Sequence, residues 1–119
     1  MRVSNKKINN TLKNQVFKTF IQALTDIKGY EQTEIFLNDF FTESELDSFA
    51  KRLAVSYWLK KGRSYNNIRT NLNVSTATIA TIEKSMKRPG FQLLLAKVEA
   101  EEWATIWAER IKKFTKINK

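Results

Sequence analysis

Residues 65–87 place small, polar and basic side chains between apolar ones at helical spacing. The apolar positions, which we expect to be buried, are Ile68, Leu72, Val74, Ile79 and Ile82. The positions left facing outward are Thr76, Ala77, Ala80, Thr81 and Lys84. Short hydroxyl and methyl groups beside an ammonium group can contact base edges and phosphates in a major groove. The pattern therefore predicts a helix-turn-helix whose recognition helix begins at Ser75, and it favours duplex DNA binding.

The residues around the two short helices fit this motif. Ser64 and Ser75 are good N-cap residues, one for each helix. Asn73 lies in the turn, where a left-handed backbone is wanted, and asparagine adopts that conformation more readily than most residues. Arg69 is long for a position that is often small, so we expect its stem to lie along the edge with the guanidinium outside.

The charge of the chain is concentrated around this motif. The formal net charge is +9, yet residues 25–50 hold seven acids against one base. Residues 51–88 hold nine bases against one acid, which is the polarity that attraction to a phosphate backbone requires. Residues expected at base edges or nearby phosphates are Ser75, Thr76, Ala77, Ala80 and Thr81. Residues expected along the DNA backbone are Lys60, Lys61, Arg63, Asn66, Arg69, Lys84, Lys87 and Arg88. The alternative is that these charges simply face solvent.

The composition argues against catalysis and against a metal site. The chain contains neither cysteine nor histidine, so a zinc site or a Cys-His or Ser-His dyad cannot be built. The acidic clusters at residues 43–47 and 99–102 are explained by placement near helix N-termini. We expect no catalytic residue, no cofactor and no metal. No apolar run is long enough to cross a bilayer, and the N-terminus is polar, so we expect a cytoplasmic protein.

Helical periodicity runs through the whole chain, and no strand pattern is present, which predicts an all-α fold. We expect helices over residues 11–28, ended by Gly29, and over residues 30–41. Thr42 and Glu45 form a capping box that opens a helix ending near Gly62. A long amphipathic helix is expected over residues 91–114. The expected organisation is a flexible basic arm (1–9), a dimerisation and helix-turn-helix domain (10–88) and a C-terminal amphipathic helix (89–119).

Three tryptophans, Trp58, Trp103 and Trp107, could stack on the bases of a single strand. All three lie on apolar helical stripes, so packing in a core or interface is the better interpretation. The C-terminal helix that carries two of them could close the core of its own domain. It could also pair with another chain, which we favour.

Residues 46–86 resemble the Trp-repressor-like helix-turn-helix proteins. The similarity is carried by Gly62-Arg63-Ser64-Tyr65 and by Ser75-Thr76-Ala77-Thr78-Ile79. The resemblance implies an intertwined all-helical homodimer that binds DNA as a transcriptional regulator, most simply a repressor. It also implies a candidate effector pocket containing Arg52 and Ser85. Tryptophan repressors have an arginine that stacks on the indole where this chain has Thr81, so a tryptophan co-repressor is not expected.

Two other functions are compatible with these residues. The chain could be a helical protein-protein adaptor whose helix-turn-helix no longer meets DNA. It could also be the DNA-recognition subunit of a transposition or replication complex, in which case another subunit would supply the chemistry.

Overall fold

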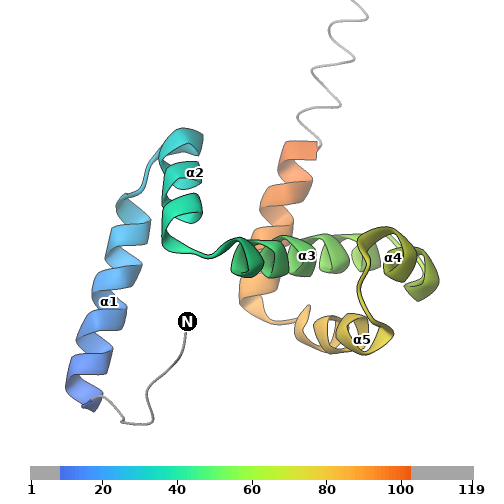
Figure 1. Ribbon diagram of the computed structural model, residues 1–119, viewed down its shortest axis with the longest axis horizontal. Coiled ribbons are helices and arrows are strands. Elements are labelled where there is room, and N and C mark those ends of the chain that lie inside the picture. The colour runs from blue at the N-terminus through green and yellow to red at the C-terminus, as the bar shows by residue number, and fades with distance from the viewer. Residues whose placement is uncertain (1–8, 103–119) are drawn as a thin grey trace, which may run out of the picture. The chain divides into compact units, whose positions relative to one another are not determined.

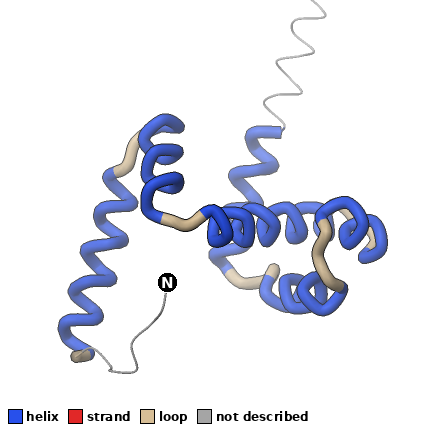
Figure 2. Tube along the Cα trace, viewed as in Figure 1, coloured by secondary structure: helices blue, strands red, loops and turns tan. Residues whose placement is uncertain are grey.

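The computed structural model describes residues 9–102, and all structural statements below concern these residues. They form helices joined by short turns, and no strand occurs within this range (Figure 2). The labelled helices are α1 (Asn10–Asp26), α2 (Gly29–Phe40), α3 (Glu43–Lys60), α4 (Tyr65–Leu72) and α5 (Thr76–Ser85). A further helical segment covers residues 89–102. The all-α prediction is confirmed. The expected arm at residues 1–9, except its last residue, lies outside the described residues, as do Trp103 and Trp107.

The chain divides into two compact units, one up to Leu46 and one from Asp47 onward. The first unit contains the hairpin of α1 and α2. Asn9 caps α1, because its Oδ1 accepts a hydrogen bond of 2.8 Å from the Thr11 N–H. The helix ends at Asp26, two residues before the expected Lys28, because Ile27 is extended at φ −68° and ψ 129°. Gly29 was expected to end α1, but it lies instead at the start of α2 with φ +78°.

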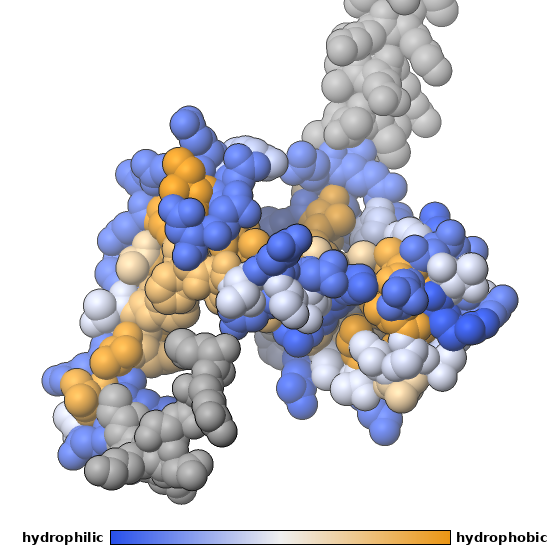
Figure 3. Space-filling view, in the orientation of Figure 1, coloured by the Kyte–Doolittle hydropathy of each residue, from blue (hydrophilic) through white to orange (hydrophobic). Residues whose placement is uncertain are grey.

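Stacked phenylalanines join the two helices of the hairpin. The ring centroids of Phe20 and Phe40 are 5.7 Å apart, and those of Phe36 and Phe40 are 5.2 Å apart. Even so, α1 and α2 contain no buried residue. Phe17 and Phe40 keep more than three fifths of their surface exposed, and orange hydrophobic residues are visible on this hairpin in Figure 3. A two-helix hairpin of this kind has an apolar surface without a core.

The predicted capping box opens α3. The Thr42 N–H donates to Glu45 Oε1 at 2.9 Å, and the Glu45 N–H donates to Thr42 Oγ1 at 3.1 Å. The hydrogen bond from the Thr42 backbone lowers the pKa of Glu45, since it favours the ionised carboxylate. The helix ends at Lys60 and is followed by Gly62 at φ +84°, close to the expected end.

The second unit has a small core built around the predicted motif. Val55 of α3, Ile68 of α4, and Ile79 and Ile82 of α5 are buried together. Half-buried side chains surround them: Trp58, Leu59, Tyr65, Leu72, Val74, Met86 and Phe91. The apolar positions predicted in residues 65–87 are therefore buried or half-buried. Phe91 shows that the segment 89–102 contributes to the same core. Among the described residues, no helix is long and apolar enough to span a membrane.

Candidate nucleic-acid interface

Helices α4 and α5 form a helix-turn-helix, and they lie next to each other in the second unit (Figure 1). Ser64 Oγ accepts a hydrogen bond of 3.1 Å from the Asn67 N–H, which caps α4. Ser75 Oγ accepts one of 3.1 Å from the Thr78 N–H, which caps α5. Asn73 joins the helices in the left-handed conformation, with φ 53° and ψ 53°. Both predicted caps and the predicted turn residue are thus confirmed.

The outward face of α5 consists of short side chains. Thr76, Ala77, Thr81 and Lys84 are exposed, as is the capping residue Ser75. Ala80 was expected to face outward but is half-buried. Residues four apart are neighbours on a helix surface, so the longer side chains of Thr76 and Lys84 flank this methyl group. A shallow, polar face with one cation near its C-terminal end therefore remains open to solvent.

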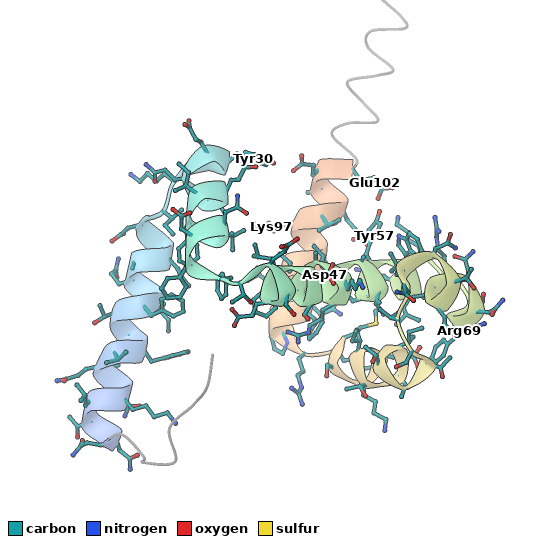
Figure 4. The ribbon with its side chains drawn as sticks, viewed as in Figure 1. Tyr30, Asp47, Tyr57, Arg69, Lys97 and Glu102 are labelled. Atoms are coloured by element: carbon teal, nitrogen blue, oxygen red, sulfur yellow. The ribbon has the colours of Figure 1, made fainter. Side chains whose placement is uncertain are left out.

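The cations around α5 are open to solvent. Lys84, Lys87 and Arg88 are exposed. Arg69 of α4 is exposed as well, and its Nη2 donates to Asn66 Oδ1 at 2.7 Å (Figure 4). This bond links two of the predicted backbone-contacting residues and leaves the guanidinium outside the motif, as expected from the sequence.

The basic cluster at the end of α3 is engaged within the chain. Lys60 Nζ lies 3.2 Å from Glu99 Oε1, and Lys61 Nζ lies 3.6 Å from Glu102 Oε2. Tyr57, labelled beside Glu102 in Figure 4, also donates a hydrogen bond to that carboxylate. The acids at residues 99–102 were expected near a helix N-terminus, but they lie ten or more residues into the helical segment 89–102, and Glu99 and Glu102 pair with these lysines instead.

Arg63 is also occupied within the second unit. Its guanidinium carbon lies 4.0 Å from the centroid of the Trp58 ring, and its Nη1 donates to Asn67 Oδ1 at 3.3 Å. Trp58 is half-buried and packs against the core rather than standing free for base stacking. The interpretation of Trp58 as a packing residue is confirmed.

The candidate effector residues Arg52 and Ser85 lie on different helices, α3 and α5. Arg52 is exposed on α3, with its guanidinium carbon 5.7 Å from the centroid of Phe49. A hollow of about 500 Å³ lies between α3 and α5, and its lining includes Arg52 and Thr81. Ser85 is half-buried and lies outside this lining, and its hydroxyl donates to the Thr81 carbonyl at 3.3 Å.

A capped recognition helix packed on a small helical core is the arrangement of a helix-turn-helix protein. Comparison with known proteins names the family. The profile of the Trp repressor protein family matches residues 15–99, so the chain belongs to that family. The family is one of DNA-binding regulators and not of enzymes, as the absence of catalytic residues from the sequence predicted.

Two individual relatives agree with this assignment. The crystal structure of a TrpR-like protein from Eubacterium eligens has a TM-score of 0.67 and 28% identity, covering 76% of this chain and 96% of that one. The uncharacterized protein YerC of Bacillus subtilis is 27% identical over 93 residues, covering 76% of this chain and 89% of YerC.

Proposed function

We propose that this protein is a sequence-specific duplex-DNA-binding transcriptional regulator that acts as a cytoplasmic homodimer, most simply as a repressor. The observation that carries the proposal is the open face of α5, with Thr76, Ala77, Thr81 and Lys84 exposed on a helix anchored by Ile79 and Ile82. A rigid core that presents short side chains outward is suited to enter a major groove.

Each group of residues has a distinct role in the proposed complex. Thr76, Ala77 and Thr81, with Ser75 and the half-buried Ala80, lie where base edges and nearby phosphates would be. Arg69, with its partner Asn66, and Lys84, Lys87 and Arg88 would hold the DNA backbone. Lys60, Lys61 and Arg63 are secondary contacts, because each already has a partner within the chain. Thr81 occupies the position of the arginine that stacks on the indole in tryptophan repressors, and a threonine cannot stack in this way. We therefore propose a regulator that does not bind tryptophan.

Exposed apolar surface in both units supports the homodimer. The hairpin leaves Leu12, Val16 and Ile21 about half exposed, and Phe17 is exposed further still. In the second unit, Phe49, Leu53, Phe91 and Leu94 line an apolar hollow of about 440 Å³. A second copy of the chain would cover surface of this kind. We also propose that the chain is organised as an arm, a dimerisation and DNA-binding domain, and a C-terminal helix after residue 88.

Selection of bound sequences from a random duplex library tests the proposed function. We expect enrichment of a palindromic site, with half-sites centred about 10 bp apart or at a multiple of that spacing, because a two-fold dimer presents two recognition helices. If no sequence is enriched and the protein elutes early from heparin as the salt concentration rises, DNA binding is contradicted.

The exposed phenylalanines of the hairpin favour one second candidate, a helical adaptor that binds another protein. An adaptor would elute early from random duplex DNA and would be found at the combined mass of itself and a protein partner. The selection experiment and a light-scattering measurement together distinguish the two functions. Recruitment to a transposition or replication complex would retain the DNA binding but require a second subunit.

A further inference from the structure

One hydrogen bond crosses from α4 to α5 on the surface of the motif. The Tyr65 hydroxyl, on the first residue of α4, donates to Glu83 Oε1 at 2.7 Å. Tyr65 is half-buried and its ring packs against the core, whereas Glu83 is exposed. Packing of the ring therefore fixes the Tyr65 hydroxyl in place. The hydrogen bond in turn restrains the Glu83 side chain, which would otherwise move freely in solvent.

Glu83 is exceptional in the charge pattern of this part of the chain. It is the single acid between Lys51 and Val98, a stretch that contains ten lysines and arginines. The cation one helical turn later, Lys87, makes no ion pair with Glu83 among the described residues. The Tyr65 hydroxyl is thus the side-chain partner that the structure gives to this carboxylate.

The position of Glu83 on α5 puts the carboxylate at the edge of the proposed DNA-facing side. Glu83 lies seven positions after Thr76, which is close to two helical turns, so the two side chains leave the helix about 20° apart. Ala80 precedes it by three residues and lies about 60° around the helix. A carboxylate that swung toward this side would approach the phosphates that Lys84 is proposed to contact, and like charges repel.

We propose that Tyr65 is a positioning residue for DNA binding: its hydroxyl holds the Glu83 carboxylate on the α4 side of the recognition helix, away from DNA phosphates. This inference rests on the proposed function. Tyr65 itself touches no base or phosphate in this arrangement. It acts through Glu83, and so its effect on affinity depends on the charge at that position.

A double-mutant cycle with Tyr65→Phe and Glu83→Gln tests the proposal, with the affinity for a labelled random-sequence duplex as the readout. Tyr65→Phe keeps the ring in the core and removes the hydroxyl, and we expect it to weaken binding by about threefold to tenfold, the range of one hydrogen bond. Glu83→Gln removes the charge but leaves an amide oxygen that can still accept the tyrosine bond. We expect it to bind as tightly as the wild type or more tightly.

The decisive comparison is Tyr65→Phe in the E83Q background, where we expect no further loss of affinity. If the hydrogen bond merely held the two helices together, the same loss would occur in both backgrounds, and that result would overturn the proposal. Weaker binding by Glu83→Gln alone would also overturn it, whether or not Tyr65→Phe folds. Tyr30→Phe is the matched control, since it removes an exposed tyrosine hydroxyl from the other unit. If the wild type binds no duplex, it is the proposed function that fails.

Discussion

At the scale of single residues, Asn73 forms the turn that connects α4 to α5. Its backbone lies in the left-handed region at φ 53°, where a side chain with a Cβ is normally strained. Asparagine tolerates this region better than alanine does, and glycine tolerates it best. The motif therefore keeps a tight turn without glycine.

Substitutions at Asn73 test this interpretation. We expect Asn73→Ala to lower the free energy of unfolding by about 1 kcal/mol, because alanine is strained in the left-handed region. Asn73→Gly is the control and should stay within about 0.5 kcal/mol of the wild type, as glycine adopts this conformation without strain. Urea denaturation measures both. Equal losses for the two variants would show that the asparagine side chain, and not the backbone conformation, is what matters.

The lysines around the motif differ in how they are engaged. Lys84 is exposed on α5 and has no ion pair within the described residues, whereas Lys60 is paired with Glu99. A lysine that contacts one phosphate adds about 0.9 to the slope of log affinity against log salt.

We therefore expect Lys84→Ala to reduce the salt-dependence slope of DNA binding by about one, and Lys60→Ala to reduce it by much less. Fluorescence anisotropy titrations at several salt concentrations measure both slopes. A larger change for Lys60→Ala than for Lys84→Ala would move the DNA backbone contacts from α5 to the end of α3.

At the scale of elements, the start of α3 depends on an ionised carboxylate. The pKa of Glu45 is lowered in the folded protein, mainly by the hydrogen bond from the Thr42 N–H and also by the Thr42 hydroxyl. A lowered pKa in the folded state means that the stabilisation is fully present above the unfolded pKa, near 4.5. It is lost as the pH falls through the folded value.

As the pH falls below about 4.5, the stability of the wild type should accordingly decrease by more than that of Glu45→Gln, which has no carboxylate to protonate at this position. Thermal unfolding at a series of pH values, followed by circular dichroism, measures the difference. Parallel curves for the two proteins would exclude a contribution from the capping box.

At the scale of the whole molecule, the described residues bury little apolar surface. The core of the second unit rests on a few aliphatic side chains, and the hairpin of α1 and α2 has no buried residue. Leu24 and Ile35 also remain exposed. Large apolar side chains left exposed in this way favour a partner that covers them, which is the physical argument for the proposed second copy.

Phe17→Asp tests that argument. Placing a charge on the apolar side of α1 should shift the protein from a dimer toward the 13.9 kDa monomer and weaken its binding to a palindromic duplex. Sedimentation equilibrium measures the mass. Asn14→Asp, an isosteric change on an exposed position of the same helix, is the control and should remain dimeric. A wild type that sediments as a monomer would contradict the proposed assembly.

Features that depend on a few neighbouring residues could be predicted from the sequence. The Ser64 and Ser75 caps, the Thr42–Glu45 capping box and the left-handed Asn73 all follow from local backbone chemistry. The end of α1 could not be placed so well, because Ile27 leaves the helical region before the glycine that was expected to end it.

The amino-acid pattern was enough to predict the helices of the described residues, the starts of the motif helices and the buried isoleucines of the motif, since helical period and capping act within a few residues. The partners of charged side chains that are far apart in the sequence became known from the packing of the helices. Lys60 meets Glu99, and Tyr65 meets Glu83, because separate helices pack side by side. Such pairs leave no periodic signal, and they determine which cations stay open to solvent and where the single acid of the motif is held.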